Sequence, residues 1–115
     1  MSAPSLAISL HFEPLRSLAS GSIMGGYVGV GTALDHPARL ILVQNLTDVT
    51  LVFSFDGIND HFVLPSQGFI LVDVTSNKTQ LGGFYLAEGS RLYVNQIGAP
   101  TTGSVYFSVM YGYNL

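Results

Sequence analysis

The chain has 115 residues, the length of one domain, with a formal net charge of −3 and no cysteine. Its four scattered Lys and Arg residues exclude electrostatic binding of nucleic acid, which needs a basic stripe. The missing cysteines exclude disulfide scaffolds, cysteine-ligated zinc and thiol nucleophiles, and charged residues interrupt each apolar run before the ~18 residues of a membrane-spanning helix.

The N-terminal part predicts one strand followed by a loop. Residues 5–12 alternate between apolar and small or polar residues, the period of a half-buried strand. No basic residue precedes this stretch, so it is not typical of a secretory signal. Residues 15–26 mix Ser and Gly and predict a loop with at most one helical turn. We therefore expect an N-terminal strand or arm with its loop at residues 1–24 and a β-sandwich domain at residues 25–115.

The middle of the chain predicts a series of strands joined by turns. The expected extended segments are 27–34, 38–45, 49–56, 61–64 and 69–74. The segment 38–45 is apolar on both faces, which predicts a central or covered strand. Asp56-Gly57 tolerates the positive φ angles of a hairpin turn, and Pro65 with Gly68 indicates a second reversal.

The C-terminal part continues the same pattern. We expect exposed loops at 75–83 and 98–103, a turn at Glu88-Gly89, and strands at 84–86, 91–97 and 104–113. This makes about eight short strands with turns every eight to twelve residues, and no helix longer than two turns. The pattern is typical of an all-β protein, an antiparallel β-sandwich or jelly roll.

The chain offers few residues for chemistry. His11, His36 and His61 are far apart in sequence, which favours surface or capping roles over metal ligation. Asp56, Asp60 and His61 lie within six residues and could ligate a divalent ion, but turn chemistry, with Asp56 opening the turn and Asp60 capping backbone amides, is favoured. No G-x-S-x-G motif or dinucleotide fingerprint is present. We predict no enzyme activity, no catalytic residue, no metal and no cofactor.

Apolar strand faces and tyrosines predict contact surfaces, because only 10% of the residues are charged. Burying the four apolar side chains of residues 5–12 contributes about 6–12 kcal/mol, whereas ordering some ten backbone residues costs about 10–20 kcal/mol. That segment therefore needs ladder hydrogen bonds, in its own sheet or in that of a neighbouring copy. The predicted interface residues are Leu6, Ile8, Leu10, Phe12, Tyr106, Tyr111 and Tyr113.

A set of turn and strand residues from about Gly25 onward resembles small virion-associated proteins of tailed bacteriophages. The residues are Asn45-Leu46-Thr47-Asp48, Ser54-Phe55-Asp56-Gly57, Asp60-His61-Phe62-Val63-Leu64-Pro65, Gly68, Asp73, Gly82-Gly83-Phe84-Tyr85 and Gly103-Ser104-Val105-Tyr106. The resemblance implies a non-enzymatic β-sandwich that decorates or cements the capsid, or forms part of the head-tail neck or collar. It implies a virion location, after assembly in the bacterial host cytoplasm. It carries over no catalytic residue.

Two functions of different classes follow. The first is the phage structural protein, a homo-oligomer such as a trimer or dimer that contacts the major capsid protein or the portal and neck proteins, with no nucleic-acid or membrane partner. The second is a small lectin-like module that binds carbohydrate or a host surface through tyrosines and Asp/Asn loops. The absence of tryptophan counts mildly against the second.

Overall fold

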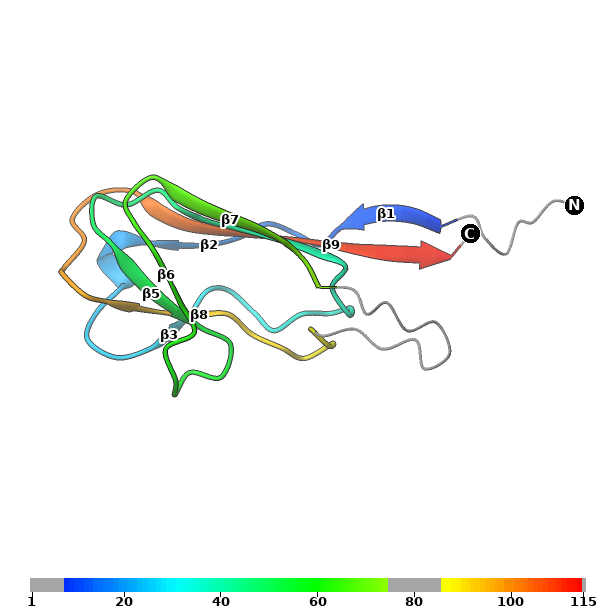
Figure 1. Ribbon diagram of the computed structural model, residues 1–115, viewed down its shortest axis with the longest axis horizontal. Coiled ribbons are helices and arrows are strands. Elements are labelled where there is room, and N and C mark those ends of the chain that lie inside the picture. Colours follow the sequence, from blue (N-terminus) through cyan, green and yellow to red (C-terminus); the bar gives the residue numbers. More distant parts are fainter. Residues whose placement is uncertain (1–7, 75–85, 115) are drawn as a thin grey trace, which may run out of the picture.

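The computed structural model describes residues 8–74 and 86–114, which form an all-β sandwich of nine strands in two antiparallel sheets (Figure 1). The strands are β1 (Ile8–Phe12), β2 (Arg16–Ala19), β3 (Val28–Gly29), β4 (Leu40–Asn45), β5 (Leu51–Ser54), β6 (Phe62–Leu64), β7 (Gly68–Asp73), β8 (Tyr93–Gln96) and β9 (Ser104–Asn114). A 3-10 turn at Ser20–Ser22 is the only helical element of the described residues. The predicted sandwich is confirmed, with nine strands where we expected about eight.

The five-stranded sheet is organised around β9. Its order is β1-β9-β4-β7, and β2 also pairs with β9. Because β9 has eleven residues, one of its sides accepts β2 along its first half and β1 along its second half. Its other side pairs with β4. The predicted central position of the strand at 38–45 is confirmed, since β4 lies between β9 and β7.

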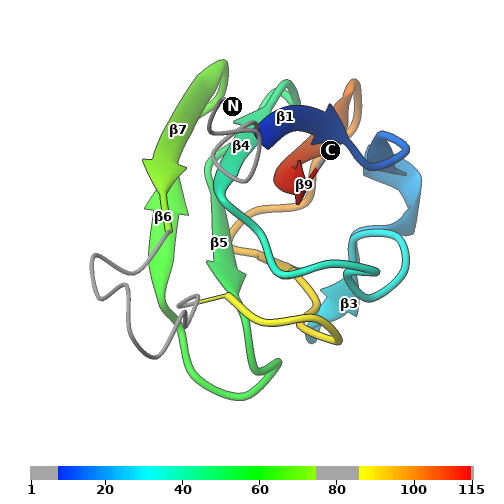
Figure 2. The same ribbon diagram turned by 90° about the vertical axis from the view of Figure 1, so that its right-hand side faces the viewer.

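The four-stranded sheet has the order β3-β8-β5-β6. The predicted hairpin at Asp56-Gly57 is confirmed: Gly57 has a φ of 73°, and β5 pairs with β6. After β6 the chain leaves this sheet and enters the other through a turn in which the Gly68 N–H donates to the Pro65 carbonyl at 2.9 Å. The end-on view shows β6 and β7 following one another along one side of the sandwich (Figure 2).

The core lies between the two sheets. Alternate residues of β4 and β9 point inward from the five-stranded sheet, and residues of β5 and β8 meet them from the four-stranded sheet. Fully or almost fully buried apolar side chains include Ile41, Val43, Leu51, Phe53, Val94, Val105, Phe107 and Val109. A period of two places these residues on one face of each strand, so the sequence pattern leads directly to the core.

Three local predictions were wrong. Residues 16–19, expected in a loop with one helical turn, form β2, because the edge of β9 supplies a ladder for them. The extended segment expected at 27–34 has only the two strand residues of β3. The strand expected at 49–56 is shorter, since only Leu51–Ser54 form β5, and all four of these residues are buried.

No helix among the described residues is long and apolar enough to cross a membrane. The predictions for residues 75–83, and for the strand at 84–86 except its last residue, lie outside the described residues. The division at residue 24 stays a prediction, although β1 and β2 both pair with β9 of the sandwich.

Candidate functional site

The predicted interface residues fall on both sides of the five-stranded sheet. Leu6 lies outside the described residues, and Ile8 and Tyr113 belong to the β1–β9 ladder. Leu10 is 50% exposed and Phe12 is 66% exposed. Residues that oppose each other in an antiparallel ladder point to the same side. Leu10 and Phe12 therefore share a side with Tyr106, whereas Tyr111 opposes His11 on the other side.

The β1–β9 ladder projects beyond the end of the sandwich (Figure 1). On its β4 side, β9 is paired only as far as Met110, which opposes Leu40. The Arg39 N–H donates to the Met110 carbonyl at 2.8 Å, so the backbone groups of Met110 point toward β4. Because direction alternates along a strand, those of Gly112 point to the same side. No described strand pairs with that side of β9 beyond Met110.

Among the described strands, the side of β1 that faces away from β9 is a second unpaired edge. The Glu13 N–H donates to the Val109 carbonyl at 3.0 Å, so in the same register the backbone of His11 faces β9, where it opposes Tyr111. The backbone groups of Leu10 and Phe12 therefore point away from β9, and no described strand pairs with them. An exposed edge of this kind is a template for pairing with another chain.

The side of the five-stranded sheet that faces away from the core, called the outer face below, is mainly apolar. The register sets Phe12 beside Met110 and Leu40, and Leu42 beside Leu71. Phe69 is 66% exposed and Leu71 is 58% exposed. Side chains that point outward from β1, β4, β7 and β9 include Leu10, Phe12, Leu40, Leu42, Phe69, Leu71, Asp73, Tyr106, Ser108 and Met110. The sequence analysis missed the share of β7, because a strand that is apolar on both faces does not show which of its faces stays exposed.

A buried ion pair closes the sandwich beneath the start of the projecting ladder. The Glu13 and Arg16 side chains are 1% and 5% exposed, and their charged atoms are 2.8 Å apart. Arg16 also donates to the carbonyls of Thr32 and Ala33 at 2.8 and 2.9 Å, and His36 shares a hydrogen bond of 2.7 Å with Glu13. Since the Glu13 carboxylate and the Arg16 guanidinium already have partners, the cluster is suited to structure rather than to chemistry.

The Glu13 pKa reflects a competition within this cluster. Burial by itself raises the pKa of Glu13, but hydrogen bonds from His36, the Asp35 amide and Arg16, together with the Arg16 charge, lower it below its usual 4.5. Tyr111 stacks on His36 with ring centres 3.7 Å apart and on His11 at 5.7 Å. The stacked rings connect the buried pair to the ladder, and no sequence motif indicated this connection.

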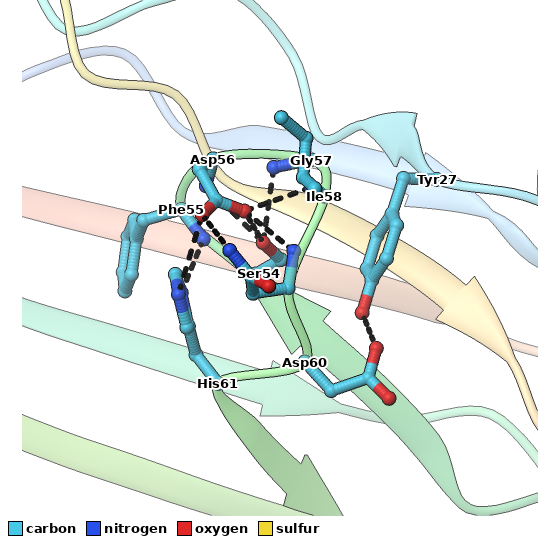
Figure 3. Close-up of polar contacts among 9 residues, drawn as sticks. Tyr27, Ser54, Phe55, Asp56, Gly57, Ile58, Asp60 and His61 are labelled. Carbon is cyan, nitrogen blue, oxygen red and sulfur yellow. Dashed lines mark hydrogen bonds and ion pairs between the residues drawn. The ribbon is translucent and has the colours of Figure 1, made fainter.

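The loop that was considered for metal binding is a closed turn (Figure 3). Asp56 accepts hydrogen bonds from the N–H groups of Ile58 and Asn59, each at 2.8 Å, and from the Ser54 hydroxyl at 2.8 Å. Hydrogen bonds lower the pKa of Asp56. The backbone N–H of Asn59 has the largest effect, and the backbone N–H of Ile58 has the next largest. His61 accepts a hydrogen bond from the Phe55 N–H at 3.0 Å. Asp56 and His61 are therefore occupied in shaping the hairpin.

We expected Asp60 to cap backbone amides, but it does not. It accepts a hydrogen bond from the Tyr27 hydroxyl instead, which joins the hairpin to the segment before β3 (Figure 3). Burial and this hydrogen bond raise the pKa of Tyr27 to about 12. Within residues 8–74 and 86–114, no group of three or more His, Cys, Asp or Glu side chains is placed to hold a metal ion.

Asp48 ties the loop after β4 to the loop before β9. Its carboxylate accepts hydrogen bonds from the hydroxyl and the N–H of Thr101. These hydrogen bonds lower the pKa of Asp48 from 3.8 to about 2, and the Thr101 hydroxyl has a larger effect than the Thr101 N–H. A depressed pKa contributes stability above the unfolded value, and this contribution is lost as the pH falls through the folded value.

We therefore expect the contact between Asp48 and Thr101 to stabilise the protein above about pH 4 and to stop doing so near pH 2. Thr101→Val removes the hydroxyl donor while it keeps the shape and the N–H. The midpoint of thermal unfolding should be lower for this variant at pH 6, and the difference from wild type should shrink between pH 4 and pH 2. A difference that stays constant down to pH 2 would contradict this assignment.

Comparisons with known proteins return one distant likeness. No protein-family model and no curated protein matches the chain. A solved structure from Bacillus endospore appendages, described as a novel family of disulfide-linked pili, is 11% identical, covers 91% of this chain and 88% of that chain, and has a TM-score of 0.46. At this identity and TM-score the likeness carries no argument about function, which has to be argued from the surfaces of this chain.

The resemblance to tailed-phage virion proteins was wrong. The structural match comes from endospore appendages, and no family model or curated protein links the chain to a phage head or neck. The expected capsid, portal and neck partners and the virion location are withdrawn with it, and none of the comparisons indicates a carbohydrate-binding module. Those residues behind the resemblance that the structure describes are turn and strand residues of the sandwich.

Proposed function

We propose that the chain is a non-enzymatic structural subunit that assembles with copies of itself through the projecting β1–β9 ladder. The observation that carries this proposal is the pair of open edges, on β1 and on the end of β9. A two-stranded ladder is marginally stable in water by itself. A strand from a neighbouring copy would satisfy the free backbone groups and stabilise the ladder.

The polar side chains support the non-enzymatic part of this proposal, because they are engaged in structural contacts. The buried carboxylate of Glu13 is paired with Arg16, and Asp56, Asp60 and Asp48 are each engaged in a turn or a loop contact. Their hydrogen bonds hold turns and loops together. The predicted interface residues Leu10 and Phe12 lie on the open edge of β1, where they would contact the added strand.

A contact between copies of this chain would contain no disulfide. The pili of the matched structure are disulfide-linked, whereas this sequence contains no cysteine. Affinity would come from ladder hydrogen bonds and from apolar side chains near the edges. Assembly should therefore be reversible on dilution, and insensitive to reducing agents.

A single substitution can block the open edge of β9 while the β1–β9 ladder stays intact. Gly112→Pro removes an N–H that faces away from β1, and the ring obstructs an added strand. The hydrogen bonds of Tyr111 and Tyr113 to β1 remain possible. We expect wild type to sediment as an oligomer at micromolar concentration and Gly112→Pro to sediment as a smaller species, with the same far-ultraviolet circular dichroism.

The matched control is Gly112→Ala, which keeps the N–H and should sediment like wild type. Removal of residues 1–12 takes away β1 and spares the buried Glu13, so it should reduce assembly without a substitution in β9. A wild-type chain that remains monomeric across the whole concentration range would refute the proposed function. Wild-type assembly in both Gly112→Pro and the truncated chain would show that the ladder is not the contact.

A further inference from the structure

We propose that the outer face of the five-stranded sheet is a second contact between copies, in which two copies pack these faces against each other. This inference rests on the proposed self-assembly and adds a surface distinct from the strand edges. Its basis is the row of outward side chains that the register places across four adjacent strands. The side chains at its exposed margins are Phe12 at 66%, Phe69 at 66%, Leu71 at 58% and Leu10 at 50% exposure.

The face is smaller than a standard interface. Along β4 it is four strands wide, about 19 Å at ~4.8 Å spacing, and about 20 Å long, and beyond Met110 only β9 and β1 of the described strands continue it for about 13 Å. The area is therefore about 500 Å² per copy. A standard stable interface buries about 800 Å² per partner. A contact of this size holds best as one of several in an assembly, beside the edge contact of the ladder.

The chemistry of the face favours a second copy over a partner of another kind. Among the described side chains that point outward from its four strands, the only charged one is Asp73, at the end of β7. A partner selected by charge would find little to recognise. Apolar sheet faces pack on one another about 10 Å apart with their strands roughly aligned, because their twists match. A copy of the same sheet has the same twist.

The arrangement also fits a two-fold relation between copies. In such an interface both copies use the same patch. If one residue of the first copy contacts another residue of the second, the reverse contact is made as well. The outer face has Phe12 and Met110 at the end that carries the ladder, and Leu71 and Phe69 along β7. A half turn about an axis across the strands sets β7 of one copy over β7 of the other.

The test uses the two exposed apolar side chains of β7, Phe69 and Leu71, which do not belong to the ladder. The double variant Phe69→Ser/Leu71→Ser should weaken association by about 100-fold or more, because it replaces two large apolar side chains of the contact with small polar ones. The matched control is Ile58→Ser/Ile97→Ser, which removes side chains that are 80% and 64% exposed but lie on other parts of the sandwich. The control should sediment like wild type. Circular dichroism melting should show both variants folded.

Because the chain contains no cysteine, disulfide formation by a single introduced cysteine provides a second test. A single cysteine introduced as Ser108→Cys, near the middle of the outer face, should form disulfide dimers on air oxidation, and Ile58→Cys should not. If Phe69→Ser/Leu71→Ser leaves the mass of the wild-type assembly unchanged and Ser108→Cys gives no dimer, the face contact is overturned while the ladder contact stands. If wild type never assembles, the proposed function fails first, and the face contact fails with it.

Discussion

Gly103→Ala is expected to lower the free energy of unfolding by about 2–5 kcal/mol. Gly103 has a φ of 85°, a conformation that costs an L-residue about 1–2 kcal/mol. An added Cβ would overlap the Leu46 carbonyl oxygen and lie 2.8 Å from the carbonyl carbon. Both atoms belong to backbone, and relieving such a contact costs about 1–3 kcal/mol more. Thermal melting should show a midpoint lower by about 10 °C or more.

Gly98→Ala is the matched control, because Gly98 precedes β9 in the same loop and a Cβ there meets nothing within 4 Å. Its effect should stay within about 0.5 kcal/mol of wild type. The damage from Gly103→Ala should spread to the pairs beside it, since the Gly103 carbonyl accepts from the Ser20 N–H and the Ser104 carbonyl accepts from the Leu46 N–H, both at 3.0 Å. Equal midpoints for the two variants would show that the loop relaxes around the added methyl group.

The strands with regular alternation could be predicted because their own residues decide their conformation. In β9 the inward residues Val105, Phe107 and Val109 alternate with half-buried ones, and the sequence predicts that strand almost to its ends. β2 is different, since Arg-Ser-Leu-Ala has no preference for extended structure. Its conformation is imposed by the free side of β9, a partner some ninety residues away. Such long-range pairing leaves no local signal.

The sequence also could not show which faces end up covered. A strand that is apolar on both faces predicts a central or covered strand. The central position of β4 confirms that expectation, but β7, which is also apolar on both faces, shows Phe69 and Leu71 to solvent. The difference depends on strand order, because β7 is at the edge of its sheet. The face that carries our further inference thus became visible only once the register of β4, β7 and β9 was known.

Turn residues were the least specific part of the sequence. Asn45-Leu46-Thr47-Asp48 contributed to the phage resemblance, although each of its polar residues has a structural task in this fold. Asn45 is buried, Thr47 is its partner, and Asp48 holds Thr101. Turn chemistry of this kind recurs wherever strands are closely connected. The polar signature therefore indicates a sandwich, and the function has to come from the surfaces.

Asn45→Ala is expected to lower the free energy of unfolding by about 3–5 kcal/mol. Asn45 is completely buried, and its amide donates to the Val49, Leu64 and Pro65 carbonyls at 2.9, 3.0 and 3.2 Å. Its side-chain oxygen accepts from the N–H and hydroxyl of Thr47 at 3.0 and 2.6 Å. One side chain thus holds together the turn after β4 and the turn after β6. Without it, buried backbone groups lose partners, at about 1–3 kcal/mol each.

Asn59→Ala is the control for this loss, since Asn59 is an exposed turn residue whose amide donates to Asp56 at 2.9 Å. The same substitution there should change stability by less than about 1 kcal/mol. Chemical denaturation of both variants, with equal m-values, would measure the difference. Because Asn45 pairs with Gly68 and Val105 on its two sides, its loss should also loosen β7, and the outer face should then assemble less well even where the chain remains folded. An Asn45→Ala variant as stable as Asn59→Ala would mean that water replaces the lost amide, and that the junction between the two sheets does not depend on this side chain.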